Sequence, residues 1–239
     1  MNETGVKPAK NYDESILSGE GENDYAKYMR TTTLLSLQRD PEQMLHRDEM
    51  LFQVIHQSTE LWLKLACYEL DEVVRCLEQG RVGDATALVG RAVTCMHLLV
   101  GQLDVLSHMT PWDFRQVRPA LGNGSGFESP GWTEVRRVGK RLSDAFDTWR
   151  AAAGIDLATL YKEQRNSPAF NLAEALVEWD ERVALWRARH YKNAVRTIGI
   201  NTVGTKGTPV DMLTAMLNHQ FFPCLWEVRS TLFAGPDAY

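Results

Sequence analysis

The sequence predicts an all-α protein built as a helical bundle, and three observations support this prediction. Apolar residues recur every three or four positions through most of the 239 residues, as they do along the buried face of an α-helix. No stretch alternates apolar and polar residues in the manner of a half-buried β-strand, and no segment is repeated. The helical segments have the length of bundle helices and are joined by short connections.

Three helices are expected in the N-terminal half of the chain. A helix over about residues 25–38 ends before Pro41, because proline disfavours helical geometry in the residue that precedes it. The second helix begins near Pro41 or Arg47 and ends before Gly80, a residue that favours a helix C-terminus. The third helix covers about residues 84–107.

Two later segments, TPWD at residues 110–113 and TPVD at residues 208–211, share a helix-start pattern. Each offers a threonine hydroxyl that can cap free backbone N–H groups, a proline at the first helical position and a carboxylate at the third. We therefore expect the first segment to begin a short helix that ends near Leu121. The second segment is expected to begin a helix that reaches Phe222.

Between these two signals the periodicity predicts further helices, separated by glycine-containing loops at residues 122–132 and 199–209. The predicted helices cover residues 133–152, 157–163 and 168–198. Residues 1–24 are rich in Gly, Glu, Asp and Asn, which is typical of a flexible or partner-docked arm. Since no linker-like segment divides the rest of the chain, residues 25–239 are expected to form a single domain.

The composition favours a soluble protein of the cytoplasm. Hydrophobic residues make up 44% of the chain, and its net charge of −5 argues against nucleic acid or an anionic membrane as a partner. There is no CxxC pair, and Cys67, Cys76 and Cys95 lie in apolar helical stretches, so buried reduced thiols are expected. No leader is recognisable in the polar N-terminus, and no apolar run reaches the roughly 20 residues of a membrane span.

One histidine lies within the apolar face of the second predicted helix. Phe52 and His56 are four residues apart on this face, and Thr59 and Leu63 continue it. An unpaired polar ring in a dry core costs roughly 1–3 kcal/mol. The pattern therefore predicts that His56 has a hydrogen-bond partner, either in the protein or in a ligand.

A second histidine, His190, lies on the long helix in a stripe with Val183, Trp186 and Ala194. From the residues alone, His190 is either a core histidine with a protein partner or the ligand of a metal. Zinc and di-iron sites are poorly supported, because no other ligand stands at the spacing that they require. A single helical histidine is, however, sufficient to hold a haem iron.

Two further candidates lie at or in the glycine-rich loop. Arg118 precedes the loop, where its guanidinium could clamp a carboxylate, although the residues alone favour a surface arginine near a helix C-terminus. Ser125 stands between Gly124 and Gly126, which permit close approach of the backbone to a ligand but also occur in a plain turn.

Together these residues resemble the tryptophan 2,3-dioxygenase family, haem enzymes that cleave the indole ring of L-tryptophan. The resemblance covers four segments, residues 25–38, 46–70, 109–129 and 189–208. The most specific motif is LFxxIHQxxELWxK, which begins at Leu51. The third segment carries the FxxxR and SGFxS spacings of the family.

The resemblance implies roles for individual residues around a haem b cofactor. His190 matches the proximal ligand of the haem iron, and Arg196 follows it at the family's spacing as a cofactor-binding residue. His56 matches the distal histidine that hydrogen-bonds the indole N–H, and Phe52 matches an aromatic wall of the same pocket.

The substrate's amino-acid end is implied to bind near the two loops. Arg118 matches the residue that binds the substrate carboxylate, and Phe114 lies one turn before it. Ser125 matches the serine near the haem, and Thr205 approximates the threonine that meets the substrate ammonium. The family also completes each pocket with N-terminal tyrosines of a neighbouring subunit, in a homotetramer; the matching residues are Tyr25 and Tyr28.

The resemblance implies that O2 is the cosubstrate and that dioxygenation gives a product of the N-formylkynurenine type. Two departures keep an alternative open: the family's GTGGSSG reads GTKGTPV here, with Lys206 in place of a glycine, and SGFQS reads SGFES, with Glu128. The alternative is monooxygenation of a tryptophan, such as a β-substituted one, to a 2-oxindole in natural-product biosynthesis. A non-enzymatic alternative is a haem-based sensor.

Overall fold

The computed structural model describes residues 13–234 and separates the chain into two compact units, Met1–Met44 and Leu45–Tyr239. The described residues form helices and contain no β-strand; their one isolated bridge joins Val203 and Pro209. The all-α prediction is therefore confirmed. The predicted arm of residues 1–24 and single domain of residues 25–239 stay a prediction.

The described part of the N-terminal unit contains two short α-helices, α1 (Asp24–Met29) and α2 (Thr31–Leu35), and a 3₁₀ turn, η1 (Pro41–Gln43). The prediction of one helix over residues 25–38 is wrong because Arg30 adopts a left-handed backbone conformation, with φ of 52°. This geometry ends α1 and begins α2. None of the residues in these helices is buried.

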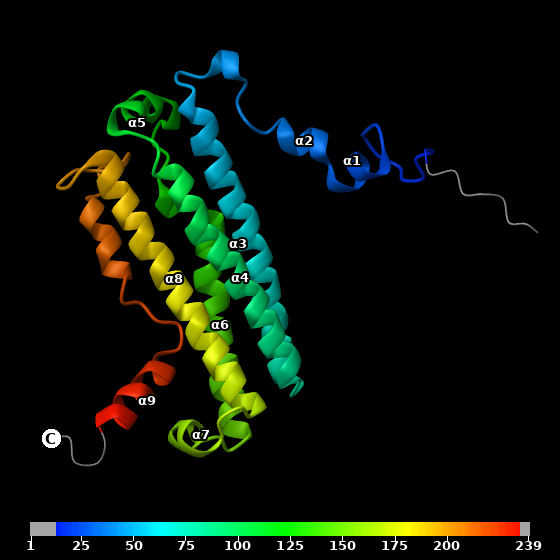
Figure 1. Ribbon diagram of the computed structural model, residues 1–239, viewed down its shortest axis with the longest axis vertical. Coiled ribbons are helices and arrows are strands. Elements are labelled where there is room, and N and C mark those ends of the chain that lie inside the picture. The colour runs from blue at the N-terminus through cyan, green and yellow to red at the C-terminus, as the bar shows by residue number, and fades with distance from the viewer. Residues whose placement is uncertain (1–12, 235–239) are drawn as a thin grey trace, which may run out of the picture. The chain divides into compact units, whose positions relative to one another are not determined.

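Four long helices form the bundle of the second unit (Figure 1). These are α3 (Asp48–Glu78), α4 (Val82–Leu106), α6 (Pro130–Ala152) and α8 (Pro168–Ile198). Helix α3 packs against α4 and α6, and α4 also packs against α8. Their apolar faces meet in one core, whose largest fully buried side chains include Phe146 and Trp179. The sequence-predicted bounds of the long helices agree with these to within about seven residues.

Helix α4 corrects one expectation from the sequence, because its length and composition would allow it to cross a membrane. The expectation that no apolar run is long enough is therefore wrong for α4. In the bundle, α4 buries Val89, Met96 and Leu99 in the core. The core helix of a soluble protein passes the same test of length and hydropathy, so its place in the bundle accounts for its apolar content.

Shorter helices lie at both ends of the bundle, with α5 at one end and α7 and α9 at the other (Figure 1). They are α5 (Pro111–Val117), η2 (Arg118–Leu121), η3 (Gly126–Glu128), α7 (Leu157–Glu163), η4 (Val210–Met216) and α9 (Pro223–Ala234). The first helix-start signal is confirmed. Thr110 Oγ1 accepts from the backbone N–H of Asp113, and the Asp113 carboxylate accepts in return from the N–H of Thr110. This reciprocal cap fixes the start of α5.

The second helix-start signal does not begin an α-helix. Its backbone pairs with the preceding loop instead: the N–H of Gly204 donates to Thr208 O at 2.9 Å, and that of Val210 donates to Thr202 O at 3.1 Å. The next residues form the 3₁₀ helix η4, which has no side-chain cap and ends at Met216. The prediction of a helix from Pro209 to Phe222 is therefore wrong.

A buried carboxylate anchors the C-terminal segment to the bundle. Asp180 of α8 accepts hydrogen bonds from the backbone N–H groups of Phe221 and Phe222 and from Trp226 Nε1, at distances of 2.9 to 3.1 Å. Phe221 packs so closely over Gly139 of α6 that a Cβ atom there would lie 2.4 Å from its ring. The segment between η4 and α9 is therefore fixed against both α6 and α8.

Candidate functional site

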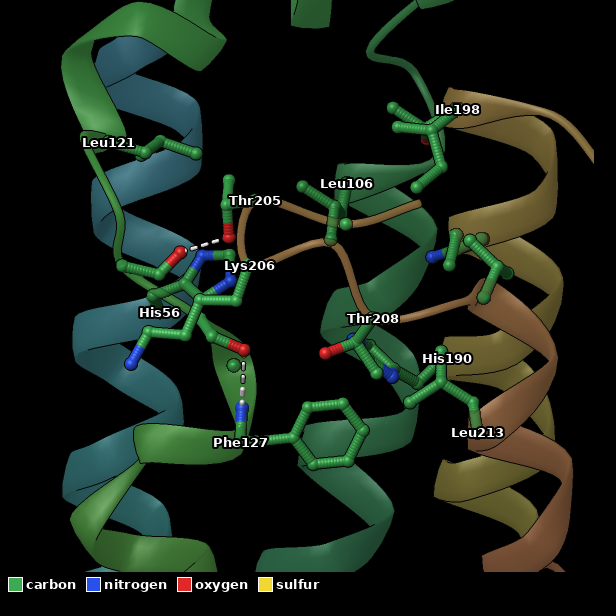
Figure 2. Close-up of a pocket in the computed structure, with 18 of the residues that line it drawn as sticks. His56, Leu106, Leu121, Phe127, His190, Ile198, Thr205, Lys206, Thr208 and Leu213 are labelled. Atoms are coloured by element: carbon green, nitrogen blue, oxygen red, sulfur yellow. Dashed lines mark hydrogen bonds between the residues drawn. The ribbon is translucent and has the colours of Figure 1, made fainter. Parts of the chain in front are cut away.

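A cavity lies at the end of the bundle where α3, α5, α6 and α8 meet the two glycine-containing loops (Figure 2). It has a volume of about 270 Å³, and its empty space counted out to the open mouth is about 1560 Å³. Aromatic and aliphatic side chains form most of the lining, with a few polar and charged groups among them. Such a lining is typical of a site for small organic ligands.

His56 projects from α3 into this cavity and forms a layer with two phenylalanines. Its ring stacks on that of Phe52 at 4.0 Å, and Phe114 of α5 lies 6.0 Å from Phe52. His56 Nδ1 lies 2.7 Å from the carbonyl oxygen of Phe52. Because a carbonyl oxygen only accepts hydrogen bonds, Nδ1 carries the proton.

The second ring nitrogen of His56 is left as a hydrogen-bond acceptor. Burial lowers the pKa of His56 below its ordinary value, and the opposing effects of the Phe52 carbonyl and of Glu60 are smaller. The ring is therefore neutral at neutral pH, with a lone pair on Nε2. Such a nitrogen suits a ligand that presents an N–H group.

His190 projects from α8 on the opposite side of the cavity, as Figure 2 shows. Its ring stacks on that of Trp186 at 4.7 Å with an interplanar angle of 7°. Burial, with a smaller contribution from His56, lowers the pKa of His190 to about 4. Within residues 13–234 neither ring nitrogen of His190 has a hydrogen-bond partner. A neutral imidazole whose ring nitrogen accepts no hydrogen bond can coordinate a metal ion through that nitrogen.

The surroundings of His190 fit a flat aromatic cofactor such as haem. Trp132 packs on Trp186 with ring centroids 4.1 Å apart, and the indole N–H groups of both residues are buried without a partner. Most of the nearby lining is apolar: Leu106, Met109, Ala194, Ile198, Leu213 and Met216. One axial imidazole in an apolar wall is a known way to hold haem iron.

The two loops are joined across the cavity by polar contacts. Arg118 Nη2 donates to the carbonyl oxygen of Gly204 at 3.1 Å. Thr205 Oγ1 donates to the carbonyl oxygen of Gly124, one of the two contacts drawn as dashed lines in Figure 2. Both side chains line the cavity. Arg118 and Thr205 thus line the cavity and also hold the two glycine-containing loops together.

Ser125 begins the short helix η3 with a cap of its own. Its Oγ accepts from the N–H of Phe127, and its own N–H donates to the carboxylate of Glu128 at 2.9 Å. Glu128 also forms an ion pair with Lys206 of the other loop. The two charged residues that depart from the family pattern are therefore partners of each other.

The structure brings together seven of the residues predicted from the sequence, all of them in the cavity wall: Phe52, His56, Phe114, Arg118, Ser125, Thr205 and His190. Arg196 is exposed and does not line the cavity. Tyr25 and Tyr28 lie in the N-terminal unit, where they are 67% and 75% exposed.

Sequence reasoning did not single out two arginines of the wall, Arg136 of α6 and Arg187 of α8. Arg187 is 7% exposed, and its Nη1 donates to the carbonyl oxygens of Met216 and His219 at 3.0 and 2.9 Å. A signal was present, because Arg187 stands one turn before His190 on a helix face that is otherwise apolar. Arg136 left no comparable signal.

Comparison with known proteins identifies the family. The sequence profile of the tryptophan 2,3-dioxygenase family matches residues 10–147, more than half of the chain. Tryptophan 2,3-dioxygenase of Myxococcus xanthus is 30% identical over 92% of this chain and 93% of its own length. The enzymes of the same name from an Arthrobacter species and from Herpetosiphon aurantiacus are 30% and 29% identical, over 87% of this chain and 91% and 98% of their own lengths.

The alignment with the Myxococcus protein also shows that this chain is shorter than its relative. It spans 271 positions but includes only 92% of the 239 residues of this chain, which is about 220. About 50 positions of the alignment are therefore gaps in this chain, although it covers almost the whole relative. With the motifs, the cavity and these relatives in agreement, the chain belongs to the tryptophan 2,3-dioxygenase family.

Proposed function

We propose that this protein is a haem-dependent dioxygenase that inserts both atoms of O2 into the indole ring of L-tryptophan, giving N-formylkynurenine. The observation that carries the proposal is the placement of His56 and His190 on opposite sides of one cavity, with Arg118 in the same wall. The relatives are named dioxygenases. Their name favours ring opening over the 2-oxindole alternative and over a sensor without turnover.

His190 is the residue that would hold the haem iron, since it is neutral and has a free ring nitrogen among the described residues. When bound, the haem supplies the binding and activation of O2, a chemistry that no side chain provides. The protein contributes the orientation of the two reactants and a largely apolar wall that excludes water.

The remaining wall residues are suited to tryptophan. His56 Nε2 accepts the indole N–H, and Phe52 and Phe114 contact the ring. Arg118 binds the carboxylate through paired hydrogen bonds, and Thr205 accepts from the ammonium, because its hydroxyl proton is already given to Gly124. Such positioning would fix the orientation of the indole in the cavity before the reaction.

We also propose that the protein is a cytoplasmic homotetramer in which Tyr25 and Tyr28 complete the pocket of a neighbouring subunit. The helices of the N-terminal unit bury none of their residues and leave both tyrosines and Leu35 largely exposed. Exposed apolar side chains of this kind require the surface of a partner to cover them.

The buried free thiols of Cys67, Cys76 and Cys95 are in accord with a reducing compartment such as the cytoplasm. Sedimentation velocity of the full chain tests the assembly state.

The test of the activity is a single-turnover experiment. The haem-loaded protein is reduced without oxygen, mixed with L-tryptophan and then exposed to O2, and the product is analysed by mass spectrometry. We expect a product that has gained two oxygen atoms. Gain of one atom would overturn dioxygenation in favour of monooxygenation, and a spectral response to tryptophan without any product would indicate a sensor.

A further inference from the structure

Two neighbouring guanidinium groups of the cavity wall have no carboxylate partner. Arg136 of α6 and Arg187 of α8 both line the cavity. Arg136 follows Trp132 by one turn of α6, and Arg187 directly follows Trp186, the indole that stacks on Trp132. Within residues 13–234 no Asp or Glu oxygen lies within 4.0 Å of either guanidinium. The hydrogen bonds of both groups go to uncharged oxygens, those of Thr133, Met216 and His219.

This arrangement is unfavourable for the protein alone. Arg187 is more than nine-tenths buried, whereas Arg136 is exposed, and a buried cation that no carboxylate contacts is costly. Burial lowers the pKa of the Arg187 guanidinium, the charge of Asp180 opposes this effect, and the charge of Arg136 adds to it. Two like charges in one cavity wall therefore indicate that an anion binds between or beside them.

The charges of the whole cavity identify the anion. Its lining contains four cationic side chains, Arg118, Arg136, Arg187 and Lys206, and no Asp or Glu. Lys206 is neutralised by Glu128. Three arginines remain. A haem b with its two propionates and an amino-acid substrate with its α-carboxylate together supply three carboxylates, and guanidinium is the side chain best suited to bind each of them.

We propose that Arg136 and Arg187 bind the propionate carboxylates of the haem, whereas Arg118 is left to the substrate. The assignment rests on the proposed function, and it deepens that proposal by naming the residues that fix the orientation of the cofactor in its plane. Arg187 also holds the carbonyl groups of Met216 and His219. It therefore links the propionate site to the segment that follows η4.

The test compares haem with its dimethyl ester, in which both propionates are uncharged. Protein prepared without haem is titrated with each porphyrin, and binding is followed by the Soret band. We expect Arg136→Gln to raise the Kd for haem by about 10-fold, as for the loss of one charge-assisted contact. The Kd for the dimethyl ester is expected to change by less than about 2-fold.

Arg137→Gln is the matched control. Arg137 is the next residue of α6, is half exposed and pairs with Glu134 instead of lining the cavity. Its replacement is expected to leave both Kd values unchanged. Arg187→Gln is expected to show the same selectivity for the charged porphyrin, with its folding checked by circular dichroism because two carbonyl groups lose a donor.

Two results would overturn the assignment. One is that Arg136→Gln and Arg187→Gln weaken both porphyrins equally, which would indicate a general effect on the pocket. The other is that the wild-type protein binds the dimethyl ester as tightly as haem. If the wild-type protein binds neither porphyrin, haem dependence itself is wrong, and that outcome is distinct from a failure of the arginine assignment alone.

Discussion

At the scale of the residue, His56 illustrates how a backbone carbonyl sets the chemistry of a side chain. Its position in an apolar stripe predicts that it needs a partner, and the structure supplies the carbonyl oxygen of Phe52, one turn earlier in the same helix. That contact places the proton on Nδ1 and leaves Nε2 to accept. Residue spacing gives the helix face of His56, but not its ring orientation, so this part of the site could not be predicted from the sequence.

The neutrality of His56 leads to a prediction about pH. Burial lowers its pKa below 6.5, and below that lowered pKa the ring becomes protonated and Nε2 becomes a donor. We therefore expect the affinity for L-tryptophan to be constant from about pH 8 down to about pH 6.5, and to fall as the pH drops through the pKa of His56. Spectral titration of the haem-loaded protein at each pH measures this Kd.

1-Methyltryptophan is the control for this experiment, because it lacks the indole N–H that Nε2 accepts. Its Kd is expected to be insensitive to protonation of His56. A parallel loss of affinity for both ligands at acidic pH would show that a group other than His56 controls the profile.

Arg118 gives a second prediction at this scale. Arg118→Ala is expected to lose about 2–5 kcal/mol of L-tryptophan binding, as for one partner of a desolvated charge pair. Tryptamine lacks the carboxylate, so its Kd is expected to change much less. Arg115→Ala is the matched control, because Arg115 lies on α5, one turn before Arg118, is exposed and does not line the cavity. Equal losses for both ligands would mean that Arg118 acts only by holding Gly204.

At the scale of the element, the two loops act as one unit because their charged residues pair. Lys206 and Glu128 form an ion pair with side chains 45% and 55% exposed. An exposed pair of this kind contributes less than about 1 kcal/mol to stability. We expect the ion pair instead to fix the positions of Ser125 and Thr205, two residues of the cavity wall that lie in the same loops.

We therefore expect Lys206→Gln and Glu128→Gln each to weaken L-tryptophan binding by about 2- to 5-fold with little change in Tm. The double variant with Lys206→Glu and Glu128→Lys is expected to recover most of the affinity, and high salt is expected to reduce all these differences. If the charge-swapped variant binds no better than the single variants, the pair does not position the loops.

The two helix-start signals show which features of an element can be predicted locally. The cap of α5 involves only Thr110 and Asp113, so the sequence contains all of its information. The residues around Thr208 have the same pattern, but their backbone pairs with Thr202 and Gly204 across a loop. Such pairing depends on how the chain returns over the cavity, which local propensity does not describe.

At the scale of the whole molecule, the periodicity of the sequence predicts the all-α bundle, and family motifs predict most of the cavity wall. What could not be predicted is the charge balance of the assembled cavity. Arg136 and Arg187 lie 51 positions apart and belong to none of the family motifs. Only the packing of Trp132 of α6 on Trp186 of α8 beside one cavity reveals that both arginines line it and that no carboxylate of the described residues contacts either of them.

The C-terminal segment is attached to the bundle through one buried carboxylate, and this gives a prediction for the whole fold. Asp180→Ala removes the acceptor of three N–H groups, those of Phe221, Phe222 and the indole of Trp226. Each buried donor left without a partner costs about 1–3 kcal/mol. We expect a loss of about 3–5 kcal/mol in the free energy of unfolding, measured by urea denaturation.

Asp180→Asn keeps one acceptor oxygen and is expected to lose less than Asp180→Ala. Asp144→Ala is the matched control, since Asp144 is an exposed residue of α6 that pairs only with Lys140 at the surface, and its loss is expected to stay below about 1 kcal/mol. Because Phe221 packs on Gly139 and Arg187 holds His219, release of this segment is also expected to weaken haem binding. If Asp180→Ala unfolds at the urea concentration of the wild type, the carboxylate does not anchor the segment.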